Sequence, residues 1–248
     1  MSPLRLAFRA GAAVLVFLVC APLHLLTKAL TGRSDWPQRF LAGVTRALGV
    51  RVRAIGAPAA AHTLLLPNHV SWIDILALSG ATGCAFVSKD QLGHPLIHWL
   101  ADQNGTVYVK RSHVKGAKDQ AAALGQALER GQPVAVFPEG TVGPGDRLLP
   151  FRSTLIEAVN LAGKDVTVRP VAIDYGAAAA DIAWYQEPVL RNIRRVLGRK
   201  GSLDVTLHLL APLDKSGDRK AMAAAARAAI ADALGFTGDE QPPIGAER

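Results

Sequence analysis

The sequence predicts an α/β fold, in which helices cover a largely parallel sheet and a helical membrane anchor precedes it. Two patterns support this prediction: an uncharged apolar run near the start of the chain, and short β-rich runs that alternate with helical stretches beyond residue 60. Strands are expected at residues 63–67, 84–88, 106–110, 133–137, 166–173 and 203–210. Helices are expected at residues 72–80, 94–102, 113–130, 153–162, 188–198 and 217–234. The predicted parts are membrane-anchoring helices (1–55), an α/β domain (56–236) and a flexible tail (237–248).

The apolar run, residues 10–27 (AGAAVLVFLVCAPLHLLT), contains no charged side chain. As a helix it reaches about 27 Å, slightly less than the roughly 30 Å hydrocarbon core of a bilayer. Pro22 and His24 weaken its second half. A full span, a half-inserted anchor and a signal peptide preceded by Arg5 and Arg9 are the alternatives. We take the anchor as the hypothesis and leave its depth open.

A second helix is expected just after this run. Pro37 suits the first turn of a helix, and Trp36, Phe40 and Val44 fall on one apolar face with Arg39 off that face. Such an amphipathic helix can lie in the membrane interface or pack into the core of the domain. The pattern does not decide between these two interpretations.

The positive charge is concentrated at the N-terminus. The net charge is +8, and the first 60 residues hold eight basic side chains against Asp35 alone. Because this charge flanks the apolar run, it predicts an anionic membrane surface as the partner and no nucleic acid. The two cysteines, Cys20 and Cys84, have no zinc-ligand spacing, so no metal is expected. Reduced thiols fit a catalytic domain on the cytoplasmic side of the inner (cytoplasmic) membrane.

The first segment with chemical character is residues 67–74 (PNHVSWID), directly after a predicted buried strand. Ser71 and Asp74 have the spacing of a capping box at a helix start. His69 then lies at the carboxyl end of a strand, where open α/β sheets bind their ligands. Asp74 can serve only as a helix cap, or it can also fix the tautomer of His69 in an acid–base dyad.

The second such segment is residues 136–141 (VFPEGT), again a strand followed by a loop. The glycines that follow give neither a Walker loop nor a nucleotide-binding fingerprint, and no Gly-x-Ser-x-Gly elbow is present. Glu139 is therefore either a polar contact to a substrate or a carboxylate bonded to its own loop.

Together these segments resemble the glycerolipid acyltransferases, typified by 1-acylglycerol-3-phosphate acyltransferase. The similarity comprises four blocks in the family's order: His-x-x-x-x-Asp from His69 to Asp74, then residues 105–111 (GTVYVKR), 137–141 (FPEGT) and 168–171 (VRPV). It spans roughly residues 60–175. The resemblance implies the glycerol-3-phosphate acyltransferase-like fold and a helical membrane anchor.

The resemblance also implies roles. His69 would be the general base for an acceptor hydroxyl, with Asp74 orienting it, and the hydroxyl would attack a thioester of coenzyme A or acyl carrier protein directly. No cofactor or metal would be needed. Arg111, Glu139, Gly140 and Thr141 would contact the substrate. Lys89 and Arg152 are further cations in or beside these blocks, and each is either a substrate contact or a solvated surface charge.

One position departs from the family pattern. The third block often continues to an Arg that grips phosphate, whereas this chain has Val142. The main hypothesis is acyl transfer to the sn-2 hydroxyl of 1-acylglycerol-3-phosphate in phospholipid biosynthesis, and the alternative is another lysolipid such as a lyso-ornithine lipid. Rival classes are a non-catalytic membrane-binding protein, which would require an inaccessible His69, and a lipid esterase, which would require a nucleophile.

Overall fold

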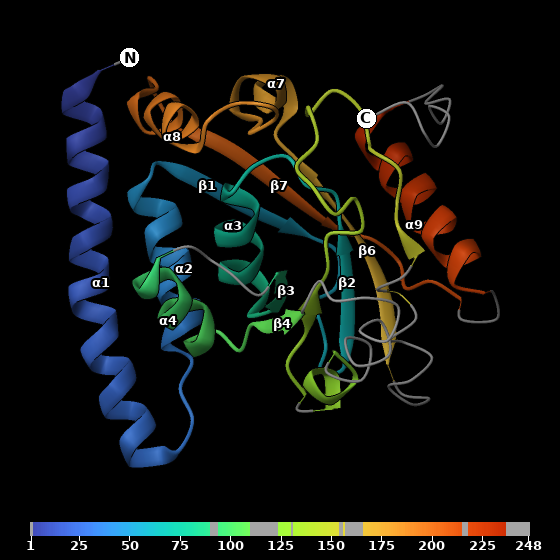
Figure 1. Ribbon diagram of the computed structural model, residues 1–248, viewed down its shortest axis with the longest axis horizontal. Coiled ribbons are helices and arrows are strands. Elements are labelled where there is room, and N and C mark those ends of the chain that lie inside the picture. The colour runs from blue at the N-terminus through green and yellow to red at the C-terminus, as the bar shows by residue number, and fades with distance from the viewer. Residues whose placement is uncertain are drawn as a thin grey trace.

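The computed structural model describes residues 2–89, 94–109, 124–129, 131–153, 156, 166–214 and 218–236. Its strands form a seven-stranded sheet in the order β1-β7-β6-β2-β5-β3-β4 (Figure 1). Every neighbouring pair is parallel except β6 with β7. The predicted α/β fold with a largely parallel sheet is confirmed.

Apart from β1, which was not expected, the strands lie within or close to the predicted β-rich runs. The strands are β1 (Val50–Ile55), β2 (Thr63–Pro67), β3 (Ala85–Lys89), β4 (Val107–Val109), β5 (Val134–Ala135), β6 (Thr167–Asp174) and β7 (Leu203–Leu209). The helical segments are α1 (Pro3–Thr31), α2 (Trp36–Ala47), α3 (Ile73–Thr82), α4 (Pro95–Gln103), η2 (Gly176–Ala178), α7 (Ala179–Ile182), α8 (Val189–Gly198) and α9 (Arg219–Leu234). Residues 124–129 are also helical. The rest of the expected helix 113–130, nearly all of the expected helix 153–162, and the tail 237–248 lie outside the described residues.

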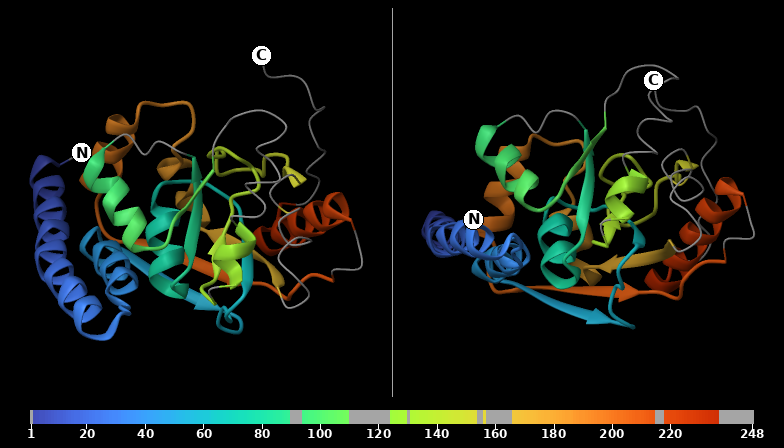
Figure 2. Two further views of the ribbon diagram at one scale, coloured as in Figure 1. Left: turned by 60° about the horizontal axis from the view of Figure 1, so that its bottom comes forward. Right: turned by 90° about the horizontal axis from the view of Figure 1, so that it is seen from below.

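The middle of the sheet, around β2, is covered on both faces (Figure 2). Successive side chains of a strand point to opposite faces, so β2 divides between two cores. Leu65 packs in a core with Leu78 of α3 and Val196 of α8. Leu64 and Leu66 pack in the other core, with buried side chains of the helical segment 124–129 and of α9. Coverage on both faces explains why β2 reads as a continuous apolar run.

Strand β1 corrects the expected division of the chain. Residues 1–55 were assigned to the anchor, yet β1 pairs in parallel with β7 along its whole length and so belongs to the sheet. Its sequence alternates apolar and basic residues, and the basic Arg51 pairs with Asp204 of β7, with Nε 2.5 Å from Oδ1. β1 is an edge strand with one solvated face, and this explains its short alternating pattern. Such a pattern is not distinctive enough to separate β1 from the anchor segment in the sequence.

Helix α1 is unbroken over its 29 residues, although Pro22 lies within it. Its length and apolar composition suffice to cross a membrane. The helix ends where Gly32 adopts a left-handed conformation with φ 72° and donates its backbone N–H to Lys28. The second expected helix, α2, packs between α1 and α3 with Val44 and Thr45 buried. The face of α2 that carries Val44 and Thr45 is therefore packed into the domain, as one of the two interpretations predicts.

Both ends of α1 are bonded to the rest of the protein. Near the N-terminal end, the buried Arg9 donates to the backbone carbonyls of Leu197, Arg199 and Gly201 at 2.8, 3.1 and 2.6 Å. Near the C-terminal end, His24 lies 3.0 Å from the amide oxygen of Gln103, and Lys28 donates to the same oxygen. In this arrangement α1 lies along the domain, beside α2 in Figure 1, and does not project from it.

Replacing Arg9 should test this anchoring of α1. Arg9→Ala should lower the free energy of unfolding by about 1.5–3 kcal/mol, because the carbonyls at the end of α8 lose a charged donor. Arg5→Ala is the matched control, since Arg5 makes one longer bond of 3.3 Å to the carbonyl of Gly198. It should cost less than about 1 kcal/mol. Denaturant titration of the full-length variants in detergent measures both, and equal losses would contradict this account.

Candidate active site

The site lies where β2 ends and α3 begins. Asn68, the first residue after β2, is buried and bonds to Ile173 of the neighbouring strand β6 in both directions, at 3.1 and 2.7 Å. These two bonds extend the pairing of β2 with β6 by one residue. His69 therefore leaves the sheet at its carboxyl edge in a fixed direction, at the location expected from the sequence.

His69 and Asp74 come together as a dyad. The imidazole Nδ1 lies 2.8 Å from Oδ2 of Asp74, whose side chain is fully buried. The same Oδ2 accepts the backbone N–H groups of Val70 at 2.7 Å and Ser71 at 2.9 Å. The bond from Ser71 is the carboxylate half of the capping box. Asp74 is thus both helix cap and histidine partner, two functions that the sequence presented as alternatives.

A third side chain completes this cluster, and the sequence did not point to it. Tyr175 directly follows β6, is buried, and donates its hydroxyl to Oδ1 of Asp74. Burial, with the charge and hydrogen bond of Asp74, raises the pKa of Tyr175 well above its usual value, so the phenol remains a donor. Because β6 runs parallel beside β2, the residues after both strands meet at one edge. The sequence around Tyr175 carries no local signal of this adjacency.

The ring of His69 is held between fixed neighbours. Phe137 stacks on it with ring centroids 3.9 Å apart, and Phe86 stacks on Phe137 at 5.7 Å. The His69 side chain is 13% exposed, and Nε2 has no hydrogen-bond partner among the residues described. Since a carboxylate can only accept, Nδ1 carries the proton in neutral His69 and Nε2 presents a lone pair.

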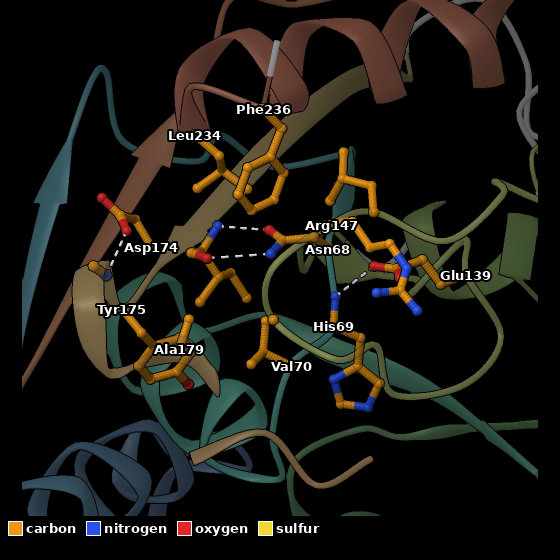
Figure 3. A pocket seen from close by; sticks show the side chains of 14 residues that line it. Asn68, His69, Val70, Glu139, Arg147, Asp174, Tyr175, Ala179, Leu234 and Phe236 are labelled. Atoms are coloured by element: carbon orange, nitrogen blue, oxygen red, sulfur yellow. Dashed lines mark hydrogen bonds between the residues drawn. The ribbon is translucent and has the colours of Figure 1, made fainter. Parts of the chain in front are cut away.

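Glu139 holds two loops beside His69. Its Oε1 accepts the backbone N–H of His69 at 2.8 Å (Figure 3), and its Oε2 accepts that of Leu149 at 3.0 Å. The residue is 3% exposed. Burial raises the pKa of the Glu139 carboxyl to about 8, although the two N–H donors act in the opposite direction. The sequence left open whether Glu139 contacts a substrate or bonds to its own loop. The structure shows its side chain bonded to the backbone of two loops.

The structure describes most, but not all, of the other residues that were expected to contact the substrate. Gly140, with φ 71°, and the exposed Thr141 follow Glu139 in the loop. Arg152 donates its backbone N–H to the carbonyl of Pro138. Its guanidinium lies against Gly140, since a Cβ atom added to Gly140 would be only 3.4 Å from it. Lys89 is the last residue of β3 and pairs with Val109 of β4, but the structure does not describe its side chain. Arg111 lies outside the described residues altogether.

One cavity is lined by His69 itself, and two larger pockets are lined by other parts of the protein. A small cavity of about 150 Å³ is lined by His69, Asn68, Glu139 and Tyr175 (Figure 3). An apolar cavity of about 490 Å³ lies between α1, α2, α3 and α4 and reaches Phe86. An open pocket of about 610 Å³ begins at Thr141 and Val142. Its other lining residues are Trp184, Tyr185, Gln186, Glu187 and Pro188.

The structure is thus an α/β protein in which the His69–Asp74 dyad lies at the carboxyl edge of the sheet. The acyltransferase family matches residues 50–174, half of the chain, including both members of the dyad. A lyso-ornithine lipid O-acyltransferase of Rhodobacter capsulatus is 33% identical, with 93% of this chain and 90% of that protein covered. A 1-acyl-sn-glycerol-3-phosphate acyltransferase of Neisseria meningitidis is 34% identical, with 54% and 52% covered. The chain belongs to the acyltransferase family.

The fold has a counterpart among solved structures. The 1-acyl-sn-glycerophosphate acyltransferase of Thermotoga maritima superposes with a TM-score of 0.69 at 20% identity, covering 96% of this chain and 97% of the other. The fold implied by the resemblance to glycerolipid acyltransferases is therefore confirmed, helical N-terminus included.

The raised pKa of Glu139 predicts a specific pH dependence of stability. Between about pH 4.5 and pH 8 the folded protein retains a proton that the unfolded chain releases, so stability falls as the pH rises. One such group changes the free energy of unfolding by at most about 1.4 kcal/mol per pH unit. Denaturant titrations across this range should show this contribution in the wild type but not in Glu139→Gln. The exposed Glu129→Gln should behave as wild type, and identical pH slopes in all three proteins would contradict the prediction.

Proposed function

We propose that the protein transfers a fatty acyl group from an acyl thioester to the hydroxyl of a lysolipid, with His69 as the general base. The observation that supports this most directly is the His69–Asp74 dyad with its open Nε2, set at the carboxyl edge of an acyltransferase-family sheet. The donor is acyl-CoA or acyl carrier protein, and the reaction uses no metal or cofactor.

In the proposed reaction, Nε2 takes the proton of the acceptor hydroxyl as its oxygen attacks the thioester carbonyl. The tetrahedral intermediate then collapses, the C–S bond breaks, and the imidazolium returns the proton to the departing thiolate. Asp74 stabilises the imidazolium and preserves its orientation. The demands on the protein are deprotonation and positioning, because a thiolate leaves readily.

No acyl-enzyme is part of this proposal. Within the described residues, no serine, threonine or cysteine is hydrogen-bonded to His69. Cys84 is fully buried, and burial raises the pKa of its thiol to about 12, so it holds little thiolate. An esterase would need such a nucleophile. A non-catalytic role would require an inaccessible His69, whereas its side chain is partly exposed.

We propose a lyso-ornithine lipid as the acceptor. The lyso-ornithine lipid relative aligns over nearly the whole of both chains, whereas the 1-acylglycerol-3-phosphate relative aligns over about half of each. Val142 supports the same choice, because an apolar side chain cannot bind a phosphate group. 1-Acylglycerol-3-phosphate, the main hypothesis from the sequence, becomes the second candidate, and the fold-level likeness to its acyltransferase favours it.

The remaining substrate contacts are also proposals. Arg111, Lys89 and Arg152 would supply positive charge beside the acceptor, and Gly140 and Thr141 would border it. The apolar cavity of about 490 Å³ would hold an acyl chain, since it reaches Phe86 and Phe86 connects through Phe137 to His69. An acyl chain seated there would extend toward the dyad.

We further propose that the outer face of α1 docks the protein on the cytoplasmic membrane, with the domain on the cytoplasmic side. With both of its ends bonded to the domain, α1 would lie along the membrane surface and not span it. The large apolar side chains exposed on this helix are Leu4, Phe8, Val14, Leu15, Leu18, Val19, Leu25, Leu26 and Leu30.

Removal of the base should abolish turnover without unfolding the protein. His69→Ala should lower kcat for acyl transfer by about 10²–10⁴-fold, the contribution of a positioned base. His98 is the matched control, because its Nδ1 faces Asp102 at 3.2 Å in a similar pair that is exposed on α4. His98→Ala should retain full activity. Wild-type turnover by a folded His69→Ala protein would end the mechanism proposed.

The acceptor can be decided at position 142. Val142→Arg adds a planar cation suited to phosphate. With lyso-ornithine lipid as the natural acceptor, the variant should lose roughly tenfold in kcat/KM toward it and gain toward lysophosphatidate. Parallel assays of wild type and variant with both acceptors measure this. A variant that improves on lysophosphatidate, starting from a wild type that already prefers it, would favour the second candidate.

Membrane docking can be tested on α1. Leu15 and Leu18 are 64% and 60% exposed, so changing both to Ser should leave stability nearly unchanged. Binding to anionic vesicles should fall by tenfold or more, because two leucine side chains no longer enter the bilayer. Co-sedimentation measures the binding, with Ile55→Ser of β1 as an apolar-to-polar control. Unchanged binding of the double variant would exclude this face of α1 as the docking surface.

A further inference from the structure

The open pocket has walls that are tied directly to the dyad segment. Thr141 and Val142 belong to the loop that Glu139 bonds to the backbone of His69. On the other side, Trp184 donates its backbone N–H to the carbonyl of Val70 at 3.0 Å. Both walls are thus bonded to residues 69 and 70. A substrate with one group in this pocket would therefore have its other end close to His69.

Glu187 carries the charge among the described residues that line this pocket. Its Oε1 accepts from Asn192 at 2.7 Å and from Arg195, and its side chain is 16% exposed. Asn192 is itself fully buried and bonded to Trp72 and to backbone carbonyls, so it fixes Glu187 in place. The hydrogen bond from Asn192 lowers the pKa of Glu187, which is therefore ionised. Within the described part of the chain, its Oε2 has no hydrogen-bond partner.

Aromatic side chains complete the lining. Trp184 and Tyr185 are half-buried there, and the indole N–H of Trp184 donates to the carbonyl of Glu187 at 3.0 Å. Gln186 has φ 51°, a left-handed conformation that is unfavourable for a residue other than glycine. Strained loop residues of this kind are typical of ligand sites. A carboxylate beside aromatic rings is a chemical environment that suits an ammonium group.

We infer that this pocket binds the ammonium of the acceptor's head group, with Glu187 as its counter-ion and Trp184 and Tyr185 as its aromatic walls. The inference rests on the proposed function and specifies how the site would recognise its acceptor. The proposed acceptor, a lyso-ornithine lipid, carries such an ammonium at the end of its ornithine side chain. The pocket would select for that charge.

The same lining disfavours a phosphate group. Among the residues that the structure describes, the side chains that line the pocket include no cation. Arg195 of α8 is already bonded to Glu187 and to the carbonyl of Ala183. A phosphomonoester would therefore meet an ionised carboxylate, an unfavourable contact between like charges. Val142 and Glu187 would act together, one by failing to attract phosphate and the other by repelling it.

The test compares two acceptors, one with a charged side-chain amine and one in which acetylation has removed that charge. Full-length wild type and Glu187→Gln would be assayed with acyl-CoA and either lyso-ornithine lipid or the same lipid acetylated on its side-chain amine. Glu187→Gln should raise KM for the charged lipid about tenfold or more, the effect of losing a charged hydrogen bond, with kcat little changed. KM for the acetylated lipid should stay within about twofold. Asp181→Asn, an exposed carboxylate on α7, is the control and should change neither KM.

Tyr185→Leu provides a second variant if Glu187→Gln does not fold. It removes an aromatic wall and should raise KM for the charged lipid about 2- to 30-fold, again without effect on the acetylated one. An equal rise in KM for both lipids, or no rise for either, would overturn the inference while leaving the proposed function intact. A wild type that acylates lysophosphatidate and not lyso-ornithine lipid would overturn both.

Discussion

The buried carboxylate of Asp74 is the group on which the geometry of the site depends. Removing an ionised carboxylate from water costs several kcal/mol unless its oxygens are bonded. Here the backbone of Val70 and Ser71, Nδ1 of His69 and the hydroxyl of Tyr175 all donate to it, and it lies in the first turn of α3. The helix terminus adds favourable electrostatics. The same bonds that make burial tolerable also orient His69.

Glu139 plays a comparable part for the surrounding loops. It ties the backbone of His69 to that of Leu149, and the carbonyl of His69 in turn accepts from Gly143. Through these bonds the loop after Phe137 is fixed against the segment after β2. Phe137 itself stacks on the imidazole, so the base is positioned by two segments about seventy residues apart in the sequence. This explains why His69 can be ordered although it lies on a loop.

Much of this was available from the sequence, and the exceptions have physical causes. His69 and Glu139 could be found because each closely follows an apolar run that reads clearly as a strand, and Asp74 because its spacing from Ser71 is that of a capping box. β1 was missed because its alternating basic residues face solvent at the sheet edge. Tyr175 and the Trp184–Glu187 loop were missed because only the pairing of β6 with β2 and the bond from Trp184 to Val70 bring them to the dyad. Such contacts between distant segments leave no local pattern.

The central claim is that His69 activates the acceptor hydroxyl for direct attack on the thioester. Direct transfer requires that the C–S bond break only when an acceptor is bound. The decisive measurement is thiol release from acyl-CoA in a rapid-quench experiment, with and without lysolipid. The account predicts no release without acceptor, and release equal to the acylated lipid formed once acceptor is added. A burst of about one thiol per protein molecule in the absence of acceptor would reveal an acyl-enzyme and contradict it.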